Sequence, residues 1–375
     1  MTPEQHAAKI RELEAPMAAA YLDEVRAVES EATVAEVERL LREGDEDSLV
    51  AYLFLSLGLF IELSRSAFIL GANNEAAGRF RFDSNTLAVI NLLREEADGV
   101  RYGVDSDLRK SIGVIRQNGR TFHNQALDIL GVRSGYTGFR SGGVLGLTGQ
   151  MTEWVETARS QLLSNNPANL RAYLRRKERD TAFDGVVKAM ISKQEEAVKK
   201  ARASAAKPSA SSRPAPSMPP LPEVPSTPSG ASRPSIAPPV PEVPGSPAPP
   251  KFSEKDADKI AKGYASKLSK ANADRVAKQA ASSAYNAGRN QSIQQMIEKG
   301  LITAGDVTKR WKTMRDERVR HSHATMNNQR VSFNEPFVSG LGGLMMYPSD
   351  QSMGASDADI YGCRCVAEYV IKKRF

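Results

Sequence analysis

Two pairs of residues that can bind a metal or act as nucleophiles lie near the C-terminal end of this 375-residue chain. His321 and His323 form one pair, and Cys363 and Cys365, the two cysteines of the sequence, form the other. In an extended backbone, side chains two residues apart point to the same face, so each pair could direct two ligand atoms to one point. Zinc binds two imidazoles and two thiolates tetrahedrally. The four residues therefore predict a candidate zinc site.

The same residues permit two other interpretations. Cys-x-Cys departs from the usual zinc-site spacing, and buried cysteines also pack as small apolar side chains, with His323 hydrogen-bonded to a carboxylate or a backbone carbonyl. A Cys–His nucleophile is the third interpretation, with Asp316 or Asp350 orienting the histidine, but no glycine-elbow context accompanies it. We therefore expect no catalytic residue and no enzymatic activity. A disulfide between cysteines so close in sequence would be strained, which favours a reducing compartment.

The segment around these pairs is predicted to combine one long helix with a small β-sheet. Ser253 is a helix N-cap, and an alanine-rich apolar stripe continues from it to Gly300, a helix-ending residue. After Gly300, short apolar runs alternate with turn residues, which is typical of strands. These runs are Trp311 to Thr313, Val331 to Phe333, Leu344 to Tyr347 and Cys365 to Ile371. We expect this sheet to dock against the helix.

The N-terminal half is predicted to be mostly helical. Residues 3–45 show helical periodicity with Pro16 at a kink, and Asp47 or Ser48 caps an apolar helix that ends at Gly71. The glycine-rich residues 131–149 lack the lysine of a phosphate-binding loop, so we interpret them as a flexible loop or docking strap. Further helices are expected over 86–97, 105–130, from 152, and over 169–205.

Residues 205–251 hold most of the 21 prolines and form a predicted linker. Proline removes backbone donors, and Ser, Ala and Gly add no core, so no packed structure is expected there. The segment contains a near-duplication, in which 212–225 returns as 232–244. Polyproline II spans are expected. The linker is a spacer, or it presents a proline-rich ligand twice to a partner.

The charge of the chain favours a polyanionic partner. Net charge is +7 and the pI is near 9.3, which suits nucleic acid or an acidic protein surface. The arginine-rich residues 171–179 could lie along nucleic acid, or could pair with acids such as Glu178 and Asp180. The most apolar run, residues 49–61, is too short to span a bilayer, so no membrane partner is expected.

Residues 300–371, and more weakly those from 253, resemble the phage Mu F-like minor head protein family, also called the phage head morphogenesis domain. The residues that carry the resemblance follow one another in the family's order: Trp311, Asp316, Arg320, His323, Pro348, Asp350, Cys363 and Cys365. Gly362 stands where the family often has Asn, and Asn327-Asn328 replaces a Gly, which is tolerable because Asn accepts left-handed backbone. His321 is not a usual family position, so the ligand set narrows to His323, Cys363 and Cys365, with zinc as the metal.

The resemblance implies a minor capsid protein of a tailed double-stranded DNA phage or prophage. Such a protein would act in prohead assembly by tethering to portal, scaffold or major capsid protein. It would be assembled in the host cytoplasm, carried in the virion head, and able to touch packaged DNA through basic regions. The alternative is an injected DNA-binding or effector protein, toxin-like and enzymatic. We expect an α+β chain with a helical region (1–204), a flexible linker (205–251) and a head morphogenesis domain (252–375).

Overall fold

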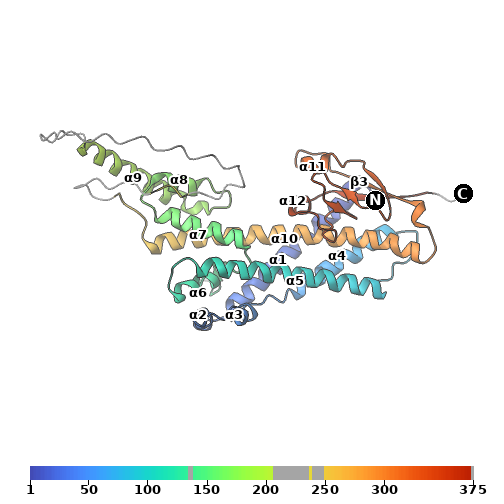
Figure 1. Ribbon diagram of the computed structural model, residues 1–375, viewed down its shortest axis with the longest axis horizontal. Helices are drawn as coiled ribbons and strands as arrows, with labels where there is room; N and C mark the ends of the chain where they lie inside the picture. Colours follow the sequence, from blue (N-terminus) through green and yellow to red (C-terminus); the bar gives the residue numbers. More distant parts are fainter. Residues whose placement is uncertain (134–137, 206–235, 239–248, 373–375) are drawn as a thin grey trace, which may run out of the picture. The chain divides into compact units, whose positions relative to one another are not determined.

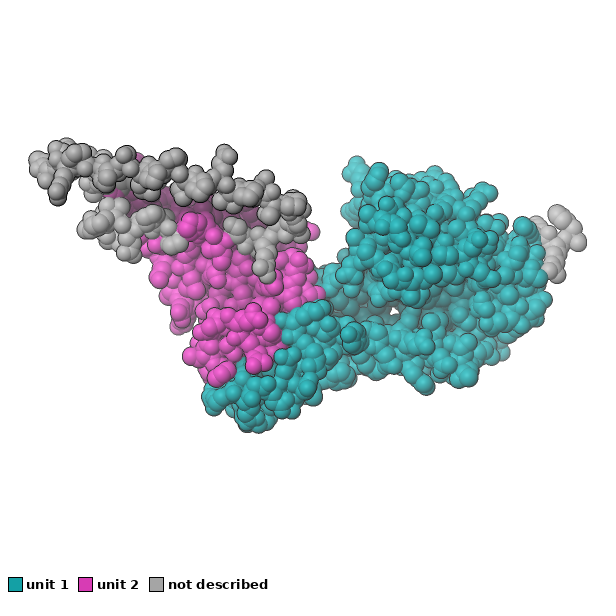
Figure 2. All heavy atoms as spheres, in the orientation of Figure 1, with its two compact units in different colours: residues 1–110, 145–147, 269–375 teal, residues 111–144, 148–268 magenta. Residues whose placement is uncertain are grey.

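The computed structural model describes residues 1–133, 138–205, 236–238 and 249–372 (Figure 1). Its contacts divide the chain into two compact units, coloured separately in Figure 2. Unit 1 comprises residues 1–110, 145–147 and 269–375, and unit 2 comprises residues 111–144 and 148–268. These units group the chain differently from the domain limits at 204 and 251, which stay predictions.

Unit 1 joins helices from both ends of the chain. Its N-terminal helices are α1 (Pro3–Glu31), α2 (Val34–Glu43), α3 (Glu46–Tyr52), α4 (Gly58–Ala76) and most of α5 (Leu87–Arg116). The long helix α10 (Glu254–Glu298) contributes its residues from Ser269 onwards. Pro16 lies inside α1 without ending it. Ser253 caps α10 as predicted, because its hydroxyl oxygen accepts a hydrogen bond from the Asp256 N–H at 3.1 Å.

The apolar run after Asp45 forms two helices, so the single helix predicted to end at Gly71 is wrong. Asp45 rather than Asp47 or Ser48 caps α3, and Leu57, in left-handed backbone with φ +53°, separates α3 from α4. Gly71 lies within α4 and does not end it. The residue is glycine because a Cβ there would stand 2.1 Å from the Tyr285 carbonyl oxygen of α10. The glycine serves close helix packing rather than helix termination.

The C-terminal part of unit 1 confirms the predicted long helix and small sheet. β3 (Val307–Lys312) lies between β4 (Arg330–Ser332) and β7 (Val366–Ile371), antiparallel to both, with Trp311 opposite Ala367. β5 (Phe337–Val338) and β6 (Leu344–Met345) form a second small antiparallel pair. One buried apolar cluster joins these strands to α10, and it includes Ile293, Met296, Trp311, Phe333, Phe337, Met345 and Tyr369. None of the described helices has the length and apolarity to cross a membrane.

Unit 2 consists of short helices around the first part of α10. Its elements are α6 (Phe122–Leu130), the hairpin β1 (Val132–Arg133) and β2 (Arg140–Ser141), α7 (Gly149–Leu163), α8 (Pro167–Leu174), the 3-10 turn η1 (Thr181–Phe183) and α9 (Asp184–Ala205). The single helix predicted over 169–205 is therefore broken, and the helix predicted over 105–130 is split after Arg116. Most of the proline-rich duplication lies outside the described residues.

A buried polar cluster ties α1, α4 and α10 together. The His6 Nδ1 atom lies 2.8 Å from the Tyr285 hydroxyl, which also accepts a hydrogen bond from the Asn74 amide at 3.0 Å. Beside it, the Arg289 guanidinium donates twice to one Glu75 carboxylate oxygen, at 2.8 and 3.1 Å. Both partners of this ion pair are buried, so the loss of either would leave an uncompensated charge.

This cluster predicts a loss of stability in mild acid. Burial, followed by the positive charge of Arg289, lowers the pKa of His6 to about 3. The unfolded chain takes up this proton near pH 6.5, so the unfolded state binds more protons between these two values. The contribution of His6 is complete above pH 6.5 and is lost as pH falls towards 3. Urea unfolding of wild type and His6→Gln across this range should show a flatter decline in the variant, and parallel curves would contradict the assignment.

Candidate functional site

The structure brings together three of the predicted metal ligands. His323 lies on α11 (His321–Ala324), and Cys363 and Cys365 lie in the loop that leads into β7. The His323 Nδ1 atom is 3.5 Å from the Cys363 Sγ atom and 3.6 Å from the Cys365 Sγ atom. All three side chains are buried, and their ligand atoms lie within 4.8 Å of one another. Among the described residues, they form the one group of three or more such side chains.

The spacing of these atoms fits a tetrahedral metal ion. Zinc binds sulfur at about 2.3 Å and nitrogen at about 2.0 Å, which places nitrogen and sulfur ligands about 3.5 Å apart on a tetrahedron. The two nitrogen–sulfur distances agree with this value. The three residues therefore fit zinc, and their type favours it, because thiolates and imidazole are its usual ligands.

A buried carboxylate orients the histidine. The His323 Nε2 atom lies 3.6 Å from the Asp359 Oδ1 atom, and neither atom has a closer hydrogen-bond partner. Asp359, on α12 (Asp357–Ile360), is itself held by the Ser339 hydroxyl, which donates to Asp359 Oδ2 at 2.7 Å. The histidine thus has the carboxylate beside Nε2 and the two sulfurs beside Nδ1. Metal-binding histidines commonly have such a carboxylate behind them.

The two thiols shift each other's pKa in opposite directions. The Cys365 thiol donates a hydrogen bond to Cys363 and so lowers the pKa of Cys363 well below its ordinary value, with His323 adding to the effect. The same hydrogen bond, with burial, raises the pKa of Cys365 well above its ordinary value. Metal binding would release thiol protons, because both sulfurs must be deprotonated to coordinate.

His321 takes no part in this cluster, so the four-ligand arrangement is wrong. The two histidines lie on a helix rather than on a strand, and residues two apart on a helix point to different faces. His321 is exposed, whereas His323 is 1% exposed. Asp359 is the residue that sequence reasoning missed. Its neighbour Asp357 has the same side chain, and only burial distinguishes the two.

The other residues of the family resemblance build the frame of the cluster. Trp311 is fully buried, with its ring edge-on to His323 at a centroid distance of 5.4 Å. Arg320 donates to the carbonyl oxygens of Ala358 and Tyr361, which fixes the chain just before Cys363. Each of these contacts holds a ligand-bearing segment in place.

Two carboxylates proposed to orient a catalytic histidine have other partners. Asp316 forms a two-pronged ion pair with Arg364, at 2.6 and 2.7 Å. Asp350 follows the buried Pro348 and accepts hydrogen bonds from the backbone N–H groups of Met346 and Ser352, at 2.7 and 2.9 Å. Both carboxylates therefore fix loops.

Two departures from the family pattern have a backbone explanation. Gly362 has φ +70° and Asn328 has φ +69°, a left-handed conformation that Gly and Asn both accept. The exchange of Gly and Asn at these positions therefore preserves the turns.

The comparison with known families agrees with this frame. Residues 254–368 match the family model described as Phage Mu protein F like protein. The expected resemblance is confirmed, and this Mu F-like segment is consistent with a phage head morphogenesis protein. It runs from the start of α10 into β7 and contains all three candidate ligands. No curated protein and no solved structure matches the chain.

A groove of about 630 Å³ in unit 1 is lined in part by the Mu F-like segment. Residues of α4, α5, α10 and the loop 347–361 line it, among them Leu93, Glu96, Val100, Gln279, Ser283 and Tyr347. The buried Gln279 Oε1 atom has no hydrogen-bond partner. Burial, with the Asp350 carboxylate adding, raises the pKa of the half-buried Glu96 to about 7. The groove therefore combines apolar walls with carboxyl and amide oxygens.

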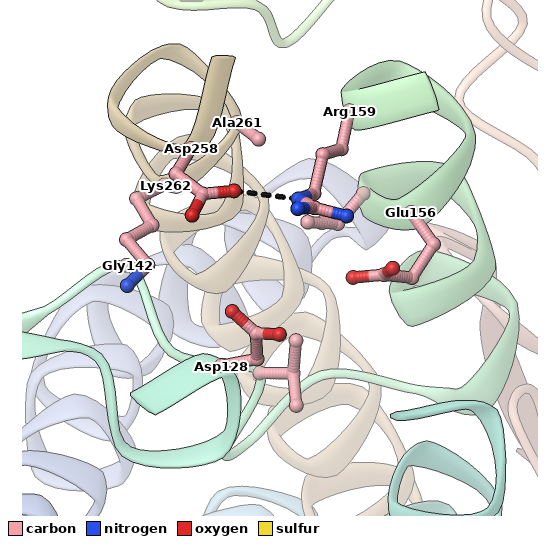
Figure 3. Close-up of a pocket in the computed structure, with 9 residues that line it drawn as sticks. Asp128, Gly142, Glu156, Arg159, Asp258, Ala261 and Lys262 are labelled. Atoms are coloured by element: carbon pink, nitrogen blue, oxygen red, sulfur yellow. Dashed lines mark hydrogen bonds and ion pairs between the residues drawn. The ribbon is translucent and has the colours of Figure 1, made fainter. Parts of the chain in front are cut away.

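Unit 2 contains a separate group of charged side chains around a small cavity, and Figure 3 shows Asp128, Glu156, Arg159, Asp258 and Lys262 among them. The Asp258 carboxylate of α10 accepts from Arg159 of α7 and from Arg120, each at 2.5 Å, and Arg120 also pairs with Asp128 of α6. The cavity between these groups measures about 10 Å³, room for about one water molecule. These ion pairs hold α6 and α7 to α10, so we assign them a structural role.

The arginines of the 171–179 run are largely paired within unit 2. Arg171 pairs with Glu195, Arg176 donates to Gln161 at 3.1 Å, and Arg179 forms a two-pronged pair with Asp184. This arrangement agrees with the paired interpretation of the sequence. It leaves fewer of these side chains available for nucleic acid.

Proposed function

We propose that this chain is a minor head protein of a tailed double-stranded DNA phage or prophage, acting during prohead assembly. The observation that carries the proposal is the match of residues 254–368 to the Mu F-like family. The helix and strands of this segment share one buried apolar core. A cluster of one histidine and two cysteines, framed by structural contacts, suits a metal-stabilised fold better than catalysis. We therefore also propose that the chain is not an enzyme.

We further propose that the groove of unit 1 is where the protein tethers to another head component. Its lining has five carboxyl groups and three guanidinium groups, so it favours a partner that brings positive charge. The occupant that fits is an amphipathic helix of portal, scaffold or major capsid protein. Its apolar face would lie along α5, and a Lys or Arg would reach Glu96 and the Gln279 oxygen.

Val100→Lys should abolish incorporation of the protein into proheads. Val100 lines the groove, and a lysine there adds bulk and a like charge against the basic helix of the partner. Tyr102→Lys is the matched control, because Tyr102 is 76% exposed on the same helix and does not line the groove. Quantitative mass spectrometry of purified proheads measures incorporation. Equal incorporation of the two variants would reject the groove as the tethering site.

Mass spectrometry of virions and empty proheads tests the wider proposal. Both particles should contain the chain at a low, fixed copy number, with cross-links to the portal, scaffold or major capsid protein. Absence from both particles would refute a structural role. Presence in virions but not in proheads would instead support an injected protein, and DNA binding that weakens steeply with salt would identify its DNA-binding form.

A further inference from the structure

Two residues of the proline-rich segment, Ala237 and Pro238, are held by polar side chains of unit 2. The Ala237 N–H donates to the Asn169 Oδ1 atom at 2.7 Å, and the Asn169 Nδ2 atom donates back to the Ala237 carbonyl oxygen at 2.9 Å. The Asn166 Nδ2 atom donates to the Pro238 carbonyl oxygen at 2.7 Å. Ala237 and Pro238 thus have all three of their backbone hydrogen-bonding groups satisfied by two asparagines.

These two asparagines, which we call the asparagine clamp, are fixed by other contacts. Asn166 is the N-cap of α8, and its oxygen accepts from the Ala168 N–H at 2.9 Å, so its amide nitrogen is left to face the segment. Asn169 is 1% exposed, and its amide nitrogen also donates to the Ser164 hydroxyl at 2.8 Å. The buried Gln194 joins the Ser164 carbonyl to that of Pro250. The clamp is therefore preorganised, which lowers the entropy cost of binding.

The clamp contacts the backbone rather than a side chain. It requires an N–H at one residue and accepts a proline at the next, since Pro238 contributes only its carbonyl oxygen. The linker contains three X-Pro-Pro segments, at residues 218–220, 237–239 and 248–250. In the third, the carbonyl oxygen of Pro250 accepts from Gln194 instead. Met218-Pro219-Pro220 repeats Ala237-Pro238-Pro239 in register, and both are followed by Leu or Val and then Pro-Glu-Val-Pro. The first copy lies outside the described residues, and its sequence alone enters this comparison.

We propose that the asparagine clamp is a binding site for X-Pro-Pro segments, and that the first repeat, residues 218–220, competes with residues 237–239 for it. The competing repeat can come from the same chain or from a second copy of it. In either case the first repeat can take the place of the second without any change in the clamp, because the contacted groups belong to the backbone. This inference does not depend on the proposed role in the phage head.

Binding of a labelled peptide of residues 212–225 to full-length protein tests the clamp. Wild type should bind weakly because its own repeats occupy the site. The double variant Met218→Pro/Ala237→Pro lacks the required N–H in both repeats, so it should bind the peptide at least about tenfold more tightly, by release of an intramolecular competitor. A peptide carrying Met218→Pro is the matched control and should not bind. Equal binding of the two peptides would refute the proposal.

The residue assignment has its own test. Asn169→Ala in the double variant should remove the gain in affinity, and in otherwise wild-type protein it should expose the Ala237 amide to hydrogen exchange. Thermal unfolding shows whether Asn169→Ala folds; if it does not, the comparison of the two peptides still decides the proposal. Unchanged exchange at Ala237 in a folded variant would overturn the assignment. Sedimentation at increasing concentration separates the two sources, because a repeat from a second copy makes the chain self-associate.

Discussion

Purified full-length protein should carry one zinc ion per chain and lose it to a strong chelator. Native mass spectrometry should show the corresponding loss of mass. The Tm should fall by about 10 °C or more, because binding to the folded site contributes directly to folding free energy. Released protons should accompany zinc binding at neutral pH, since Cys365 must give up its thiol proton. The full chain is required, because α1 packs against β7 and the C-terminal segment alone would lack that cover.

His321 and His323 lie two positions apart in the sequence, and only His323 belongs to the cluster, so they provide a matched comparison. His323→Ala should abolish zinc binding and lower the Tm, whereas His321→Ala should retain both zinc and stability, because His321 is exposed and outside the cluster. Cys363→Ser should behave like His323→Ala. If the chelator changes neither the mass nor the Tm of the wild-type protein, the zinc prediction is wrong. The two cysteines are then apolar core residues.

Gly288→Ala should destabilise the protein by about 3 kcal/mol or more. A Cβ at this position would lie 1.9 Å from the Phe68 carbonyl oxygen, a backbone atom of α4 that cannot rotate away. The two helices would have to separate along a buried face that also contains the reciprocal contact of Gly71 with Tyr285. Urea unfolding measures the change.

The sign of this effect is diagnostic. Glycine to alanine inside a helix ordinarily stabilises by up to about 1 kcal/mol. Gly113→Ala is the control, because Gly113 lies within α5 and its added Cβ would meet nothing within 4 Å. We expect Gly113→Ala to match or exceed wild-type stability. A Gly288→Ala protein as stable as the Gly113→Ala protein would show that α4 and α10 do not approach this closely.

Local sequence signals predicted the elements better than their contacts. The alanine-rich stripe predicted the long helix α10, and the glycines of α4 and α10 show how closely the two helices approach. Gly71 was interpreted as a helix end because a helix-ending glycine and a packing glycine look alike in sequence. The difference depends on Tyr285, a residue far along the chain.

The candidate site shows the same division. The spacing of Cys363 and Cys365, with the order of the family residues, identified two sulfurs and one imidazole that the structure brings together. His321, which only the spacing offers and the family resemblance leaves out, points to a different face because the local backbone is helical. Asp359 could not be selected, since its burial depends on how α12 folds over Ser339.

The composition of unit 1 has a consequence for synthesis of the protein on the ribosome. Residues 1–110 cannot complete unit 1 until residues 269–375 have been synthesised. Unit 2 is complete once residue 268 has emerged. At roughly 5–20 residues per second, translating the intervening 160 or so residues takes about 10 to 30 s. During that interval the apolar faces of α1 and α4 have no α10 to cover them. We therefore expect the nascent chain to bind ribosome-associated chaperones. A premature stop codon would leave the first helices without their packing partner, in addition to removing the last strand.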